Sequence, residues 1–80
     1  MDFSFDVVRT RTGDQLHTAL VTRYEGKEPH TRSRTSCGCR VAAVIKRDVV
    51  VKAGLLCEKC FTPAFVERCS TNGLLNVRLV

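Results

Sequence analysis

The stretch Leu56-Cys57-Glu58-Lys59-Cys60-Phe61 holds two thiols separated by two residues. This spacing lets the backbone wrap around one metal ion and bring both sulfurs to it. A tetrahedral zinc site needs four such ligands, so Cys57 and Cys60 would supply half of one. We therefore expect a small domain stabilised by a Zn²⁺ cofactor, with the other ligands elsewhere in the chain.

The composition of the chain favours such a metal staple. The chain has 80 residues, no Trp, one Tyr and four Phe. We expect one domain over residues 1–80, and hydrophobic cores of this size are often marginal without a staple. The five cysteines cannot all pair within one chain, because their number is odd.

The redox state expected of the thiols follows from the segments that the sequence lacks. No secretory signal follows Met1, and no apolar run approaches the roughly 20 residues needed to span a bilayer. We expect a cytoplasmic protein with no membrane partner, in which thiols stay reduced. Closely spaced, reduced cysteines favour metal over disulfides.

The remaining metal ligands have several candidates. Cys37 precedes Gly38, which permits a tight backbone turn. In an extended strand Cys37 and Cys39 would point to the same face, which predicts a site of four thiolates, Cys37, Cys39, Cys57 and Cys60. The competing set replaces Cys39 by His17, which opens an apolar strand. His30 is expected in a solvent-exposed loop, and Cys69 is expected as a small buried apolar residue.

The order of these residues resembles a group of very small zinc-binding proteins of actinobacteria and their phages. The matching residues are His17, Cys37-Gly38, Arg40-Val41 and Cys57-Glu58-Lys59-Cys60, within residues 16 to 61. The resemblance implies a fold like a zinc ribbon or treble clef and the ligands His17, Cys37, Cys57 and Cys60. Cys39 stands where a basic residue is usual, and it is the first substitute as a ligand.

The N-terminal part of the chain reads as strands. Residues 3–9 and 16–23 predict a β-hairpin around the turn at Gly13, although 16–23 also fits a short helix. Residues 25–36 are polar and predict a flexible loop with a basic tip. The β-branched runs 40–45 and 49–52 predict a second hairpin or a bent strand pair.

The C-terminal part predicts one helix and one strand. Thr62-Pro63 is a typical helix start, so we expect a short helix over 63–69 that stops by Asn72-Gly73. Residues 74–80 read as a last strand with a free edge. The predicted fold class is therefore α+β, a small strand-rich zinc-stabilised domain with two hairpins, one short helix and a C-terminal strand.

The formal net charge of +5 suits an anionic partner. The predicted contact residues are basic and come from the middle of the chain: Arg32, Arg34, Arg40, Lys46 and Arg47. Guanidinium groups beside hydroxyls suit phosphate contact. Few aromatic residues accompany this charge, which weakens a model of base stacking.

These patterns predict a non-enzymatic interaction module, a small regulator or adaptor that docks on a protein partner. No phosphate-cradling glycine loop or catalytic constellation is visible in the sequence, and no small-molecule substrate is expected. One alternative is a zinc module that contacts nucleic-acid phosphates through the basic 27–52 region. A second is a thiol redox protein, since a Cys-x-x-Cys pair before a helix also suits redox chemistry.

Overall fold

An antiparallel hairpin of β1 (Asp2–Thr10) and β2 (Leu16–Arg23) is the longest regular element of the fold. The computed structural model describes residues 2–80. The turn between the strands includes Gly13 at φ 88°, a conformation that glycine adopts without strain. The predicted first hairpin is confirmed, and residues 16–23 form a strand and not a helix.

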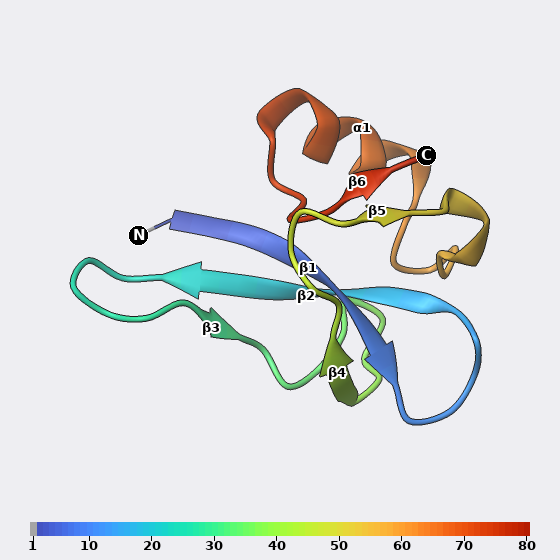
Figure 1. Cartoon of the computed structure of the whole chain (residues 1–80), viewed down its shortest axis with the longest axis horizontal. Coiled ribbons are helices and arrows are strands. Elements are labelled where there is room, and N and C mark those ends of the chain that lie inside the picture. The colour runs from blue at the N-terminus through green and yellow to red at the C-terminus, as the bar shows by residue number, and fades with distance from the viewer. Residues whose placement is uncertain (1) are drawn as a thin grey trace.

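Two short strands extend this hairpin into a curled sheet. β3 (His30–Thr31) pairs with β2, and β4 (Val41–Val44) pairs with β1, which gives the order β3-β2-β1-β4. The chain between the two outer strands pairs with itself, because the N–H of Val41 donates to Ser33 O and the N–H of Thr35 donates to Cys39 O. The outer strands are thereby joined at one end, so the sheet curls (Figure 1).

Both faces of the central hairpin are covered. Asp6, Val7 and Val8 are consecutive in β1 and all are 0% exposed. Because successive side chains of a strand point to opposite faces, such a run requires cover on both sides. Val7 packs into the main hydrophobic core. Val8 lies opposite His17 on the other face, which the segment between β3 and β4 covers.

A second small sheet and the single helix lie beside the curled sheet (Figure 1). β5 (Val50–Val51) pairs in parallel with β6 (Arg78–Leu79), and a short 3₁₀ helix covers Ala53–Leu55. Helix α1 spans Pro63–Asn72. Within residues 2–80 no helix has the length and apolar character needed to cross a membrane.

Helix α1 begins and ends where its sequence signals predict. The Thr62 hydroxyl accepts a hydrogen bond from the N–H of Phe65 at 3.2 Å, and Pro63 occupies the first turn. Gly73 ends the helix in the left-handed conformation, and its N–H donates to Cys69 O. The helix is therefore confirmed, about one turn longer than the predicted 63–69.

The second predicted hairpin is wrong in its pairing. The two runs do form strands, but β4 pairs with β1 and β5 pairs with β6, so they belong to different sheets. Asp48, between them, has a φ of 66°, and the preceding Arg47 turns in to the buried Asp6. The run that forms β4 therefore pairs with the open edge of β1, and the run that forms β5 pairs with the C-terminal residues. The two runs do not pair with each other.

Two other expectations need correction in detail. The predicted flexible loop at 25–36 contains β3 and the buried Thr35, since its backbone pairs along the outer edge of β2. The predicted strand at 74–80 is regular only at Arg78–Leu79. Its edge is not entirely free, because β6 pairs with β5 and Asn76 N–H donates to Phe5 O.

Asp6 of β1 is a buried carboxylate that hydrogen-bonds to side chains from three segments distant in the sequence. Its carboxylate accepts two hydrogen bonds from Arg47 at 2.9 and 3.0 Å, one from the Asn76 amide at 2.8 Å and one from the Thr31 hydroxyl at 3.0 Å. Burial by itself raises the pKa of Asp6, but these hydrogen bonds outweigh it and hold the pKa below its ordinary value of 3.8. The carboxylate is therefore charged and fully satisfied.

We expect Asp6→Asn to destabilise the chain. The change keeps the size of the side chain and removes the charge that Arg47 meets. The free energy of unfolding at neutral pH should fall by about 2 kcal/mol, measured by urea denaturation. Asp48→Asn, at an exposed acid nearby, is the matched control and should change little.

The effect of Asp6 on stability has a defined pH range. Because the folded pKa is lowered, its contribution is present above the unfolded pKa and is lost as the pH falls through the folded pKa. The difference between wild type and Asp6→Asn should thus stay constant from about pH 8 to about pH 5. A difference that shrinks within this range would contradict the assignment.

Candidate metal centre

His17 enters the site from the second position of β2. It is 8% exposed, and the strand register places it opposite the buried Val8. The preceding residue, Leu16, packs into the main core and bridges to Leu56. The alternation of the strand thus sends Leu16 to the core and the imidazole to the other face, with Nδ1 toward the sulfurs of Cys37 and Cys60.

Cys37 is carried by a tight turn whose geometry depends on Thr35 and Gly38. The Thr35 hydroxyl accepts from the N–H of Cys39 at 2.9 Å and lies 3.3 Å from the Cys37 sulfur. Gly38 has a φ of 96°, which disfavours any residue with a side chain. The neighbouring Ser36 donates its N–H to Thr18 O, which fixes the turn against β2.

The Cys-x-x-Cys segment forms the other wall of the site. The N–H groups of Cys60 and Phe61 both donate to Cys57 O, at 3.1 and 2.9 Å, so the backbone turns tightly between the two thiols. The N–H of Cys57 donates to Leu16 O, which attaches the segment to the edge of β2 next to His17. Both cysteines are buried.

The four side chains converge on one point. The donor atoms of His17, Cys37, Cys57 and Cys60 all lie within 4.8 Å of one another. His17 Nδ1 is 3.3 Å from Cys37 Sγ and 3.6 Å from Cys60 Sγ. In a tetrahedral site with ordinary Zn–N and Zn–S bond lengths, an N···S edge measures about 3.6 Å. The cluster therefore could hold a metal ion with little rearrangement.

Cys39 lies beside this cluster and outside it. Its sulfur is 3.9 Å from that of Cys37, but its side chain is exposed. The turn at Gly38 breaks the extended geometry that would have pointed both thiols at one ion. The strand argument for a four-thiolate site with Cys39 is therefore not met, and His17 takes the fourth place in the cluster.

The pKa values of the neighbouring thiols Cys37 and Cys39 shift in opposite directions. The Thr35 hydroxyl is the largest cause that lowers the pKa of Cys37, to about 6. The hydrogen bond to Cys37 is the largest cause that raises the pKa of Cys39. Since the thiolate is the metal-binding form, the lowered pKa suits Cys37 as a ligand. Burial raises the pKa of the Cys60 thiol, which a bound cation would reverse.

The remaining predicted residues lie away from the cluster. Cys69 is buried in α1, as expected, and burial raises the pKa of its thiol. His30 is exposed in β3. Arg34 donates to Gly38 O at 3.0 Å and supports the turn that carries Cys37, whereas Arg47 is engaged by Asp6. Two of the five predicted contact residues, Arg34 and Arg47, thus have hydrogen-bond partners within the fold.

Two kinds of residue near the site were missed by the sequence reasoning. Thr35 holds the turn through its hydroxyl, and a Thr two residues before Cys-x-Cys is a recognisable signal for a side-chain-supported turn. Arg11 and Lys59 line hollows beside the cluster together with Arg40. Arg11 lies 26 or more residues from either cysteine pair, and nothing in the sequence indicates this proximity.

The fold and the cluster together define a class of protein, a small strand-rich α+β domain with a possible metal site of one histidine and three cysteines. Compared with known proteins, the chain matches no family model, no curated protein and no solved structure. Membership of the actinobacterial and phage group therefore stays a prediction, although the four residues on which the resemblance depends do come together.

Single substitutions test which side chains hold the metal. His17→Ala, Cys37→Ser, Cys57→Ser and Cys60→Ser should each reduce the affinity for Zn²⁺ by at least about tenfold, measured by competition with a chromogenic chelator. Cys39→Ser and Cys69→Ala are matched controls that retain one zinc per chain. Loss of zinc in Cys39→Ser with retention in His17→Ala would assign the four-thiolate set instead.

Proposed function

We propose that this chain is a non-enzymatic binding module, a small regulator or adaptor, whose fold is held by one Zn²⁺ ion. The observation that carries this proposal is the convergence of four donor atoms from three separate segments. The proposed ligands are His17, Cys37, Cys57 and Cys60. The ion would tie β2, the turn before β4 and the segment before α1 to one another.

The donor set supports zinc as the metal. One imidazole and three thiolates form a common structural zinc shell, while magnesium and calcium prefer oxygen ligands. A shell of four protein donors leaves no position for a water molecule, so such an ion does not activate water for hydrolysis. Its contribution is to stability, because ligand binding becomes folding free energy when the unfolded chain lacks the site.

A protein partner is the favoured target of the module. Several large apolar side chains are exposed, namely Phe3, Tyr24, Val44, Val50, Leu55 and Val80. Val44 belongs to β4, an outer strand of the curled sheet, where backbone groups are open to pairing. These features support docking on a protein. We also propose that the chain comes from a phage or an actinobacterium. The only support for this origin is the resemblance of its ligand pattern to that group.

The redox alternative makes a different demand on the same thiols. All five cysteines are free, and Cys57 and Cys60 are both buried. A redox dithiol needs an accessible attacking sulfur, whereas a structural ligand does not. Burial of both thiols beside an imidazole therefore supports the metal proposal over the redox one.

Removal of the metal tests the structural role. A chelator strong enough to strip zinc should lower the melting temperature sharply or abolish cooperative unfolding, as followed by circular dichroism. If free zinc is about 1,000 times its dissociation constant, the ion contributes about 4 kcal/mol to stability. The reducing agent is kept constant so that no disulfide forms. A metal-free chain that melts like the zinc-loaded chain would exclude the proposal.

A substitution on the outer strand tests the protein partner. The wild-type chain, immobilised on beads, should capture a protein partner from a cell extract. The Val44→Asp variant, with zinc still bound, should fail to capture it. Ala64→Asp places the same charge on the exposed start of α1 and should leave capture intact. The extract is treated with nuclease, since a partner that is lost on nuclease treatment would favour the nucleic-acid alternative.

A further inference from the structure

Two hollows open beside the metal centre and share part of their walls. One has a volume of about 330 Å³ and the other about 580 Å³. Gln15, His17 and Cys39 line both. The first hollow reaches Lys59, and the second reaches the β1–β2 turn and Arg40. We treat them as one depression, the metal-side depression, defined by the residues of both hollows.

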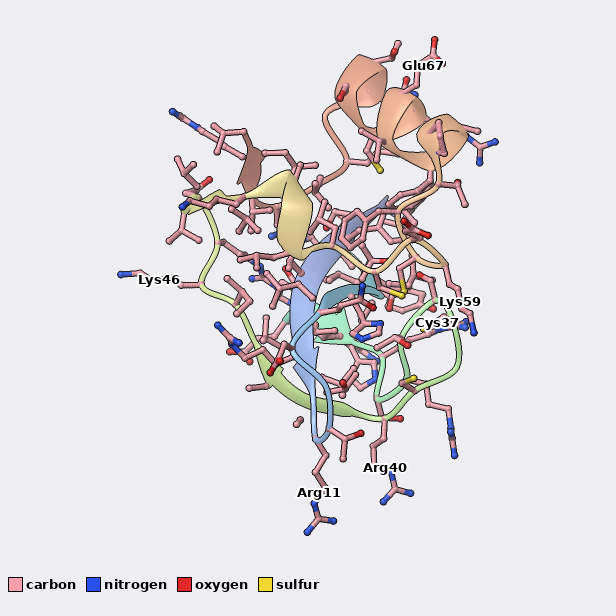
Figure 2. The ribbon with its side chains drawn as sticks, turned by 90° about the vertical axis from the view of Figure 1, so that its right-hand side faces the viewer. Arg11, Cys37, Arg40, Lys46, Lys59 and Glu67 are labelled. Atoms are coloured by element: carbon pink, nitrogen blue, oxygen red, sulfur yellow. The ribbon has the colours of Figure 1, made fainter. Side chains whose placement is uncertain are left out.

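The lining of the metal-side depression is cationic and rich in hydrogen-bond donors. It is made of the following residues: Thr10, Arg11, Thr12, Gly13, Gln15, His17, Cys37, Cys39, Arg40, Cys57, Glu58 and Lys59. Figure 2 shows Arg11 and Arg40 projecting at the same end of the molecule and Lys59 beside Cys37, with Lys46 on the opposite side. Glu58 is the only acidic residue of this lining.

The cations of the depression are not consumed by acidic neighbours. Among the described side chains the one ion pair joins Arg47 to Asp6. Arg11, Arg40 and Lys59 have no such partner there. A zinc ion with three thiolates carries one net negative charge, and Glu58 adds another. Three lining cations exceed these two negative charges. Next to the lining, Arg34, hydrogen-bonded to Gly38 O, adds one positive charge, and Asp14, between Gly13 and Gln15, adds one negative charge.

We propose that the metal-side depression binds the phosphate backbone of a nucleic acid. This inference goes beyond the proposed function, because it assigns a second ligand to a surface distinct from β4. It uses the proposed zinc only to hold the turn that carries Arg40. Guanidinium groups pair with phosphate oxygens in a bidentate way, and Thr12 lies within the same lining and adds a hydroxyl donor.

The composition of the depression favours phosphates over an acidic protein face. Protein interfaces depend on apolar or aromatic anchors at their centre, and no large apolar side chain lines this depression. No Phe, Tyr or Trp lines the depression to offer a platform for stacked bases, and the one ring, that of His17, belongs to the metal cluster. Binding should thus depend on backbone charge and be nearly independent of base sequence.

The test is the salt dependence of oligonucleotide binding. The zinc-loaded chain is titrated into fluorescein-labelled oligothymidylate and oligouridylate, with anisotropy as the readout. Three phosphate contacts on a single strand give a slope of log K against log salt of about −2. Arg11→Ala combined with Arg40→Ala should reduce the slope to about −0.7 and weaken binding about 20-fold at 0.1 M salt.

The control removes the same charge elsewhere. Arg68→Ala combined with Arg78→Ala takes two arginines from α1 and β6, outside the depression, and should change the slope little. Equal losses in the two double variants would overturn the proposal, because binding would then follow net charge alone. Displacement of the oligonucleotide by polyglutamate of equal charge would overturn it too and assign the depression to acidic proteins.

The outcome is separable from that of the zinc proposal. Zinc content and melting temperature are measured for every variant in the same buffer. A folded, zinc-loaded wild type that binds neither oligonucleotide overturns the depression proposal and leaves the zinc module standing. A chain without zinc that still binds with the expected slope and loses binding on removal of Arg11 and Arg40 supports the depression and shows that this binding does not require the metal.

Discussion

The candidate site depends on one geometric feature, that four donor atoms from three segments lie within 4.8 Å of one another. His17 comes from a strand, Cys37 from a turn and the Cys57–Cys60 pair from the segment before α1. The hydrophobic core between these segments is small and is built largely from Val, Leu and thiols. A chain of this size gains little from burial alone, so a metal ion bound at this junction would have a large effect on its stability.

The same hairpin also carries a buried carboxylate, Asp6, which joins distant segments through hydrogen bonds and not through a metal-binding cluster. Asp6, on the face of β1 that also carries Val8, receives hydrogen bonds from β3, from Arg47 after β4 and from Asn76 near the C-terminus. The His/Cys cluster brings together β2, the turn that carries Cys37 and the segment before α1. Asp6 connects β1 to β3 and to the C-terminal segment at Asn76. The two junctions together explain how β1 and β2 are buried on both faces in so short a chain.

The surface has two regions of different character, which suits an adaptor. The curled sheet ends at β4, where Val44 is exposed, and the metal-side depression gathers Arg11, Arg40 and Lys59. The turn of Cys37 connects these regions, because it precedes β4 and also borders the depression. An ion that orders this turn would therefore shape both surfaces at once.

The sequence predicted those features that depend only on residues close together in the chain. The Cys57–Cys60 spacing, the helix signals at Thr62 and Gly73, and the first hairpin are all set by residues a few positions apart. Pairings between distant segments were not readable. The partners of β4 and β5, the salt bridge from Arg47 to Asp6, and the position of Arg11 in one hollow with His17 and Cys39 depend on which edges remain open after the hairpin forms. That is a property of the assembled chain, because a strand edge accepts any segment whose register and burial fit it.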